Sequence, residues 1–289
     1  MQVVAKNLSF TYGEKTKAIA VKALDSVNLT VNEGEFFGII GHTGSGKSTF
    51  VQHLNGLIRV GKNNGQLTVG NYDLTDKNCD LKGLRSKVGM VFQYPEHQLF
   101  AETVFDDVAF GLKSFNKELP DFEVALRVQK AIETVGLNYE SVKDKSPFEL
   151  SGGQKRRVAI AGVIVTEPEV LVLDEPAAGL DPVGKRDFIV LLKSIHKGFA
   201  KTIIIVSHDM NLVSENCDRV AVFYKGTVAS VGTPKEVFSD YQKVKELGLE
   251  LPLTASLTLA LQENGVNLDS DLTVDGFVSA LSKRAKGEV

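Results

Sequence analysis

The chain has 289 residues, of which 43% are hydrophobic, with two cysteines and a formal net charge of −3. This length and composition allow one large domain with an appendage, or two small domains, with enough apolar residues for a sizeable core. The slightly acidic balance argues against a dedicated nucleic-acid binder, and no apolar run approaches the roughly 20 residues that span a bilayer. Cys79 and Cys217 lie far apart without metal-ligand spacing, and we recognise no secretory signal, so we expect a reducing, intracellular compartment.

The first forty residues predict an antiparallel sheet followed by a buried strand. Apolar and polar residues alternate from Val3 to Tyr12 and again from Val27 to Val31, which is the pattern of strands with one buried face. Asn32-Glu33-Gly34 predicts a turn. The continuous apolar run from Phe36 to Ile40 then predicts a strand that is buried on both faces.

A glycine-rich loop follows this strand directly. It consists of Gly41, His42, Thr43, Gly44, Ser45, Gly46, Lys47 and Ser48, and Thr49 opens a segment to Leu57 whose apolar residues fall on one helical face. Strand, glycine-rich turn and helix are the context of a phosphate-binding loop, in which backbone N–H groups turn inward and the helix N-terminus adds partial positive charge. We expect Lys47 to reach the β- and γ-phosphates of a nucleotide, and the Ser48 hydroxyl to ligate Mg²⁺.

The rest of the chain alternates strands with helices. Short strands are predicted at 67–69 and 88–92, and helical spacing from about 95 to 165 predicts a helical subdomain inserted between core strands. Two further buried runs, separated by an amphipathic helix, favour a mostly parallel sheet covered on both faces. The remaining expected elements are strands at 170–173 and 202–206 with the helix at 184–197 between them, a hairpin at 220–231, and helices at 252–265 and 273–283.

The strand at 171–173 ends in two adjacent carboxylates. Because side chains alternate along a strand, Asp174 and Glu175 can take different tasks. Asp174 would hold Mg²⁺, usually through water, and Glu175 would orient or deprotonate an attacking water. Two acids at a strand end are often only a solvated turn, but a phosphate loop in the same sheet favours the functional interpretation.

A second anion site is predicted at Leu150-Ser151-Gly152-Gly153-Gln154. Ser151 is an N-cap candidate, and its hydroxyl together with glycine N–H groups would bind an anion at the helix N-terminus. One nucleotide does not obviously need two such sites in one subunit. Here the sequence resembles the ATPase subunits of ABC transporters, in which this signature motif covers the γ-phosphate of ATP held by the opposite subunit. The resemblance assigns Ser151 and Gly153 to that contact.

The same resemblance implies further site residues. Gln93 matches the Q-loop glutamine that touches Mg²⁺ and the γ-phosphate, Asp181 matches the D-loop aspartate that faces the partner subunit, and His208 matches the switch histidine that hydrogen-bonds the γ-phosphate. Tyr12 matches the aromatic residue that stacks on adenine, with Phe10, two residues away, as the alternative.

The motifs also resemble a narrower group, the ATPases of energy-coupling factor (ECF) transporters. The matching segments are 41–44, 92–100, 146–149 and 155–159, together with an extra C-terminal segment. This likeness implies an α/β protein: a P-loop ABC ATPase core, 1–235, with an N-terminal antiparallel β subdomain and the inserted helical subdomain, followed by a C-terminal helical extension, 236–289. The extension would contact the other ATPase, or form a self-packed cap.

The resemblance further implies function and partners. The chain would bind ATP and Mg²⁺ and, as a peripheral protein on the cytoplasmic face of the cell membrane, power uptake of vitamins or transition metals. Its partners would be a second, often non-identical ATPase subunit, a transmembrane coupling subunit and a substrate-binding membrane subunit, with no nucleic acid. A groove near Gln93 would hold helices of the coupling subunit, with Phe100, Phe105 and Phe110 as candidate lining residues.

Two alternatives remain open at this point. One is a soluble ABC ATPase that acts on nucleic acid or ribosomes, although such relatives typically carry two cassettes or a long coiled-coil insertion. This chain has one cassette, no heptad run and no basic arm. The other is the ATPase of a different ABC importer class that uses soluble binding proteins, against which the motifs flanking the signature argue.

Overall fold

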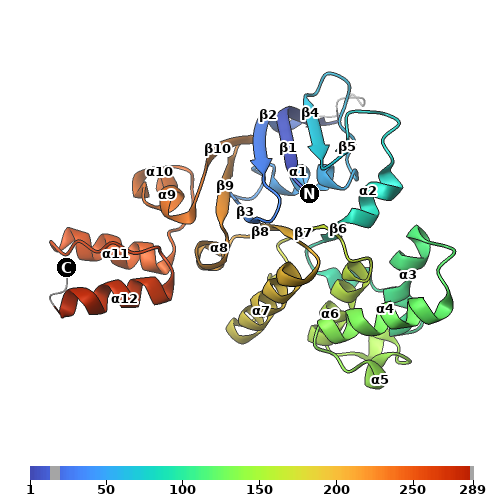
Figure 1. Cartoon of the computed structure of the whole chain (residues 1–289). Helices are drawn as coiled ribbons and strands as arrows, with labels where there is room; N and C mark the ends of the chain where they lie inside the picture. The colour runs from blue at the N-terminus through green and yellow to red at the C-terminus, as the bar shows by residue number, and fades with distance from the viewer. Residues whose placement is uncertain (14–19, 287–289) are drawn as a thin grey trace.

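Two β-sheets and three groups of helices form the computed structural model, which describes residues 1–13 and 20–286 (Figure 1). The smaller sheet is antiparallel, with strand order β2-β1-β4-β5. Its strands are β1 (Val3–Tyr12), β2 (Val21–Val31), β4 (Gln66–Val69) and β5 (Tyr72–Asp73). The antiparallel sheet predicted near the N-terminus is therefore confirmed.

The larger sheet has six strands in the order β10-β9-β3-β8-β7-β6. All neighbouring pairs are parallel except β10 and β9, which form the expected antiparallel hairpin. The strands are β3 (Phe36–Ile40), β6 (Val88–Val91), β7 (Val170–Asp174), β8 (Thr202–Val206), β9 (Arg219–Tyr224) and β10 (Thr227–Gly232). This arrangement confirms the mixed, mostly parallel sheet.

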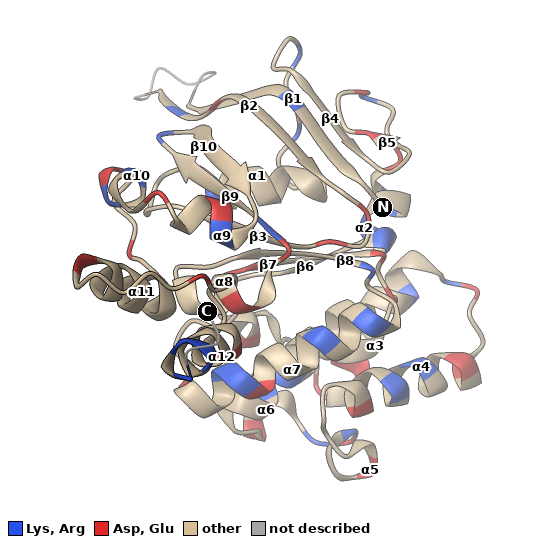
Figure 2. Cartoon of the chain, turned by 60° about the vertical axis from the view of Figure 1, so that its left-hand side comes forward, with Lys and Arg blue, Asp and Glu red and all other residues tan. Residues whose placement is uncertain are grey.

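The larger sheet separates two hydrophobic cores, because successive side chains of a strand point to opposite faces. Phe37 and Ile39 of β3 pack with the smaller sheet and with α1 (Lys47–Leu54). Phe36 and Ile40 pack on the other side, with helices drawn below the sheet in Figure 2. Complete burial of such a side chain stabilises the fold by about 1.5–3 kcal/mol. The α1 helix ends before Leu57, which is 50% exposed, so the expectation that Leu57 shares the buried helical face is wrong.

The helical segment predicted at 95–165 is present. It consists of η1 (Pro95–Gln98), α3 (Val104–Phe115), α4 (Asp121–Thr134), α5 (Tyr139–Val142), η2 (Pro147–Glu149) and α6 (Gly152–Ile164). The predicted apolar stripe of α4 is buried, and Gly136 follows the C-cap residue with φ of +74°. Outside this segment the sheet is flanked by α2 (Leu81–Lys87), α7 (Pro182–Gly198) and α8 (Met210–Asn216).

The C-terminal segment contains four helices where the sequence predicted two. They are α9 (Pro234–Phe238), α10 (Tyr241–Glu246), α11 (Leu253–Glu263) and α12 (Val274–Ala285). Pro252 is the N-cap of α11 and not its first helical residue, and Gly265 follows the C-cap Asn264 with φ of +79°. Phe238 and Leu249 belong to the same core as Leu212 of α8, so the start of the extension packs directly on the ATPase core.

The predicted apolar face of α11 exists but is turned outward. Leu253 is 59% exposed and Leu257 43%, whereas the opposite side of the helix buries Thr254, Ala255 and Thr258. On the neighbouring α12, large apolar side chains are exposed as well. We call this set the terminal apolar residues: Leu253, Leu257, Val274, Val278 and Leu281.

Candidate nucleotide site

The glycine-rich loop joins the end of β3 to α1, as predicted. Gly46 is the N-cap of α1 with φ of +103°, and Gly41 has φ of +150°. A Cβ at Gly41 would lie 2.3 Å from the carbonyl oxygen of Phe223, and one at Gly46 would lie 2.5 Å from that of Ala23. Glycine is therefore required at both positions by the close approach of backbone, and the loop is held against strands of both sheets, β9 through Phe223 and β2 through Ala23.

Lys47 is turned into this loop. Its side chain is almost fully buried, and Nζ donates hydrogen bonds to the carbonyl oxygens of Gly41 at 2.7 Å and His42 at 2.9 Å. Burial lowers the pKa of Lys47, while the charges of Glu175 and Asp174 raise it. His42 contributes its carbonyl oxygen to the Lys47 contact, and its side-chain Nδ1 donates to Thr43 O at 2.7 Å.

Asp174, at the end of β7, is buried beside Ser48. Its Oδ1 has no hydrogen-bond partner. Burial raises the pKa of the Asp174 carboxyl, against the hydrogen bond from Ser48 and the charge of Lys47, which lower it. A buried carboxylate oxygen without a partner is costly, and a hard divalent cation is the ligand that would satisfy it. The Asp174–Ser48 pair therefore fits Mg²⁺.

This magnesium site would depend on few protein ligands. In the part of the chain that the structure describes, no group of three or more His, Cys, Asp or Glu side chains could hold a metal ion. Mg²⁺ commonly uses one or two protein oxygens and completes its octahedron with water and substrate phosphates. Ser48 and Asp174 are consistent with that coordination, whereas the side chain of Gln93 contacts the neighbouring Glu175.

Glu175 joins two of the other predicted residues. Its Oε1 lies 2.6 Å from Nε2 of His208, which donates, and its Oε2 accepts from Nε2 of Gln93 at 3.4 Å. The Glu175 backbone has φ of +50°, in the left-handed region that side chains with Cβ disfavour, so the chain turns sharply away from β7. Adjacent Asp174 and Glu175 consequently face different partners, as predicted, but the cause is this turn and not strand alternation, because β7 ends at Asp174.

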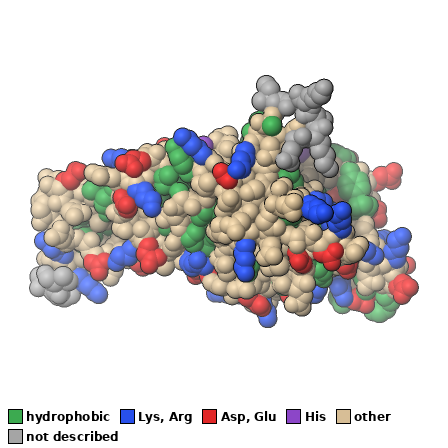
Figure 3. Space-filling view, turned by 90° about the horizontal axis from the view of Figure 1, so that it is seen from above, with side chains coloured by type: hydrophobic (Ala, Val, Ile, Leu, Met, Phe, Trp, Pro, Cys, Tyr) green, Lys and Arg blue, Asp and Glu red, His purple; other side chains and the backbone are tan. Residues whose placement is uncertain are grey.

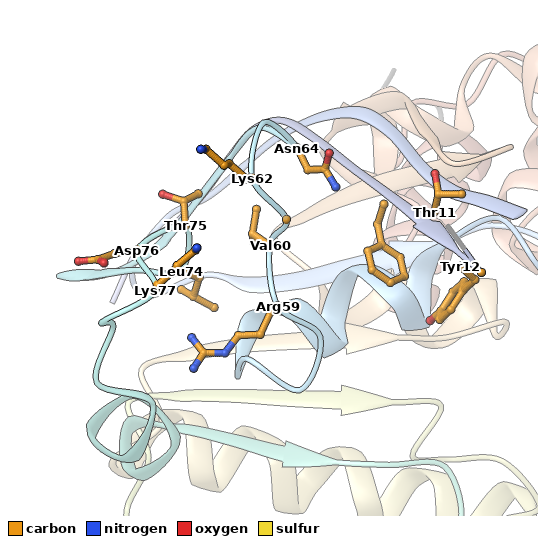
Figure 4. Close-up of a pocket in the computed structure, with 13 residues that line it drawn as sticks. Thr11, Tyr12, Arg59, Val60, Lys62, Asn64, Leu74, Thr75, Asp76 and Lys77 are labelled. Carbon is orange, nitrogen blue, oxygen red and sulfur yellow. The ribbon is translucent and has the colours of Figure 1, made fainter. Parts of the chain in front are cut away.

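Tyr12, at the end of β1, lies over the start of α1. Its hydroxyl is hydrogen-bonded to the Thr49 hydroxyl at 3.3 Å, and its ring is 44% exposed. Phe10 makes edge-to-face contacts with Tyr12, at a centroid distance of 4.7 Å, and with buried His53, at 5.1 Å. Phe10 lines the same cavity as Tyr12 but is the more buried of the two rings, so the geometry favours Tyr12 as the stacking residue. Tyr12 also borders a cavity of about 900 Å³ (Figure 4).

The signature motif forms the start of α6 as predicted. Ser151 is the N-cap and forms a capping box: its hydroxyl accepts from the Gln154 N–H at 3.4 Å, and its own N–H donates to Gln154 Oε1 at 3.1 Å. Gly152 and Gly153 are exposed, and a Cβ at either would meet nothing within 4 Å. Neither has a positive φ. Within residues 1–13 and 20–286, no contact explains why these two residues are glycines.

The D-loop aspartate is engaged locally. Asp181 is the N-cap of α7, and its carboxylate accepts from the Gly184 N–H at 2.6 Å. Its predicted approach to a partner subunit therefore stays a prediction.

Sequence reasoning missed the direct contacts among these residues and one further group, His53. This histidine is fully buried, Nδ1 donates to Thr49 O at 2.7 Å, and burial lowers its pKa. Its role is therefore packing.

The phosphate loop, the carboxylate pair at the end of β7 and the signature helix, arranged on a six-stranded sheet beside an antiparallel β-sheet, define an ABC-type ATPase. In agreement, the ABC transporter family profile matches residues 24–178. The chain belongs to this family and, within it, to the energy-coupling factor transporter ATP-binding proteins. It is 47% identical to the ATP-binding protein EcfA2 of Clostridioides difficile over 99% of each chain, and 48% identical to that of Symbiobacterium thermophilum over 97% of this chain and 96% of the relative.

Solved structures agree with this assignment. CbiO1 from Clostridium perfringens, described as part of the ABC transporter complex CbiONQ, is 40% identical with a TM-score of 0.71 over 88% of this chain and 97% of its own. A dimeric ATP-binding cassette bound to ADP and Pi in a post-hydrolysis state is 30% identical, with a TM-score of 0.70 over 80% of this chain and 98% of its own. The predicted fold class and the function as an ECF-type transport ATPase are confirmed, and the two alternative functions are not supported.

Proposed function

We propose that this chain binds Mg²⁺·ATP between its own phosphate loop and the signature motif of a second ATPase subunit, and that hydrolysis powers import through a membrane coupling subunit. The observation that carries the proposal is the pair of signature glycines. They are exposed, unstrained and free of neighbours, so a ligand from outside the chain best explains them. The γ-phosphate of a nucleotide on the opposite subunit is such a ligand.

The local half of the site would hold the nucleotide. Backbone N–H groups of residues 41–46 and the Lys47 ammonium would bind the phosphates, and the Tyr12 ring would stack on adenine. On binding, the Lys47 ammonium would exchange its two loop carbonyls for phosphate oxygens. Mg²⁺, held by Ser48 and Asp174 with Gln93 nearby, would neutralise charge on the phosphates.

Glu175 would act as the general base in hydrolysis. Its carboxylate is oriented from two sides by His208 and Gln93 and can accept a proton from an attacking water. His208 would bind the γ-phosphate as its contact to Glu175 opens. Loss of the γ-phosphate removes contacts that hold the two subunits together, so ATP-bound and ADP-bound pairs favour different arrangements.

The membrane partner would dock beside the helical segment. A groove of about 300 Å³ is lined by Leu57, Phe92, Phe115, Val163 and other residues at the boundary between α6 and the sheet. Phe100 and Phe110 are more than half exposed and pack edge-to-face at 4.9 Å, while Phe105 is partly buried in the core. Phe100 and Phe110 therefore suit an apolar partner helix better than Phe105 does.

Association with a membrane would come from that partner. No helix within residues 1–13 and 20–286 is long and apolar enough to cross a bilayer. Among the described residues, acidic and basic side chains are interspersed over the face shown in Figure 3, which gives nucleic acid no continuous basic surface there. We place the chain on the cytoplasmic face of the cell membrane, with a substrate-binding membrane subunit that selects a vitamin or a transition metal.

The extension, 236–289, would contact the second ATPase through the terminal apolar residues. Five large apolar side chains exposed on two adjacent helices favour a protein partner over a self-packed cap. The names of the relatives support a transporter assembly but do not specify whether the second ATPase is identical to this chain.

Purification of the tagged chain from membranes in mild detergent tests the proposal. Mass spectrometry is expected to identify a second ATPase and two unlike membrane proteins. Phe100→Ala with Phe110→Ala should lose the membrane proteins and keep nucleotide binding, whereas Phe122→Ala, an exposed phenylalanine on α4, should lose neither. Recovery with ribosomes, or with soluble proteins alone, would contradict the transport role.

A further inference from the structure

One arginine connects three motif segments. Arg156, in α6, is only 7% exposed, and arginine is rarely so buried unless it is paired. Its Nε and Nη2 donate to the two carboxylate oxygens of Glu96 at 3.2 and 3.4 Å, and Nη2 also donates to the carbonyl oxygen of Ala178 at 3.0 Å.

Arg156 and its two partners come from functionally distinct parts of the chain. Arg156 follows the signature motif by two residues, Glu96 lies in η1 just beyond Gln93, and Ala178 lies three residues after Glu175 in the D-loop. The Gln93–Glu175 hydrogen bond then closes a ring: Gln93, Glu96, Arg156, Ala178 and Glu175. The base, the Q-loop, the signature helix and the D-loop are thus joined by one continuous set of contacts.

Stability alone does not explain this arrangement. The desolvation cost of a buried ion pair offsets most of its Coulombic attraction. Well-packed apolar residues in the same place often stabilise a fold by an equal amount. The following residue, Arg157, shows what a structural contact in the same helix looks like: its Nη1 donates to Val135 O within the helical segment. Arg156 pairs with Glu96 inside the same segment and, unlike Arg157, also donates across the boundary to Ala178 in the core.

We propose that Arg156 is a positioning residue that couples displacement of the helical segment to the placement of the Glu175 carboxylate, through Glu96 on one side and the Ala178 carbonyl on the other. This inference rests on the proposed function. A movement of α6 or η1, where the membrane partner would dock, shifts the guanidinium and with it the backbone that follows Glu175. The planar fork of arginine can hold both partners at once, whereas a lysine ammonium at the end of a flexible stem cannot reproduce that geometry.

The test uses the complete transporter purified in lipid nanodiscs, with steady-state ATPase kinetics. Arg156→Lys is expected to lower kcat by about tenfold, the equivalent of one charge-assisted hydrogen bond, and to leave KM for ATP within about twofold. Glu96→Gln should lower kcat likewise. The double variant, Arg156→Lys with Glu96→Gln, should be no slower than the slower single variant, because both substitutions interrupt the same ring of contacts. Arg157→Lys is the matched control and should keep kcat. The binding stoichiometry of a fluorescent nucleotide measures the folded fraction of each variant, and kcat is expressed per folded molecule.

Swapping the two charged residues distinguishes the effect of the ion pair from the effect of the hydrogen bond to Ala178. Arg156→Glu combined with Glu96→Arg can restore the ion pair but not the hydrogen bond to Ala178, so thermal stability is expected to recover while kcat stays low. Full recovery of kcat, an unchanged kcat in Arg156→Lys, or an equal loss in Arg157→Lys would each overturn the inference. If the wild-type complex itself fails to hydrolyse ATP, the proposed function fails and not the role of Arg156 alone.

Discussion

Replacement of Gly153 by alanine separates folding from function at the signature motif. Gly153 lies in the first turn of α6 without a positive φ, and a Cβ there would meet nothing within 4 Å. Alanine is the better helix former, so Gly153→Ala should leave the free energy of unfolding unchanged or raise it by up to about 1 kcal/mol. ATP affinity of the isolated chain should also be unchanged, because its own phosphate loop is intact.

The Gly153→Ala variant should lose ATPase activity only when two ATPase subunits share a nucleotide. A methyl group on the glycine that faces the partner's γ-phosphate would prevent close approach of the backbone N–H, and loss of one donor to a transition-state anion typically slows turnover by about 10²–10³-fold. The assays are thermal denaturation, ATP titration of the isolated chain, and ATPase activity of the assembled pair. Gly198→Ala is the control, since Gly198 also has open space around its Cα, no positive φ and a place at the end of α7.

Two results would refute this reasoning. A loss of more than about 1 kcal/mol in stability would mean that the fold itself needs glycine at this position, against the geometry. Full ATPase activity of the assembled pair would mean that the motif does not approach the opposite nucleotide.

Further predictions concern the local site. Gly41→Ala should destabilise the fold by about 2–4 kcal/mol in thermal denaturation, since its Cβ would lie 2.3 Å from a backbone oxygen; an unchanged melting temperature would contradict the tight contact. Glu175→Gln should keep ATP binding and lower turnover by about 10²–10⁴-fold; wild-type turnover, in a pair with the equivalent partner variant, would remove Glu175 from the mechanism. Lys47→Ala should weaken ATP binding at least about tenfold by titration calorimetry; an unchanged affinity would count against the phosphate loop. Because burial raises the pKa of Asp174, the native state binds the proton of this carboxyl group more tightly than the unfolded state does. The stability that Asp174 contributes therefore falls as pH rises above 3.8, its ordinary pKa, and through the raised pKa. Asp174→Asn should therefore gain more stability over wild type at pH 7 than at pH 4 without Mg²⁺, and an equal gain at both pH values would contradict the burial argument.

The sequence predicted the central sheet and the loop because both depend on local pattern. Apolar runs of about five residues that are bounded by turn residues are typical of buried strands, and glycine spacing is fixed by backbone contact. Three short helices, α8, α9 and α10, carry too few residues for a periodic signal, although the capping box that Thr233 and Glu236 form at α9 was readable beforehand.

The outward face of α11 shows a different limit. Periodicity identifies an apolar face but not what covers it. Thr254 is buried instead because its hydroxyl donates to Leu272 O at 2.6 Å, and Thr258 because its hydroxyl donates to Thr254 O at 2.8 Å. Contacts between distant segments, such as those of Arg156 with Glu96 and Ala178, likewise have no local signature.

Glu175 and Tyr94, the residue after Gln93, hold a left-handed backbone, with φ of +50° and +55°. Each such residue costs about 1–2 kcal/mol that glycine would avoid. If Glu175 is the general base, a laboratory selection for heat resistance alone would favour glycine at position 175 and remove that base while raising the melting temperature. On that assignment, a glutamate in this backbone conformation serves chemistry at a cost in stability.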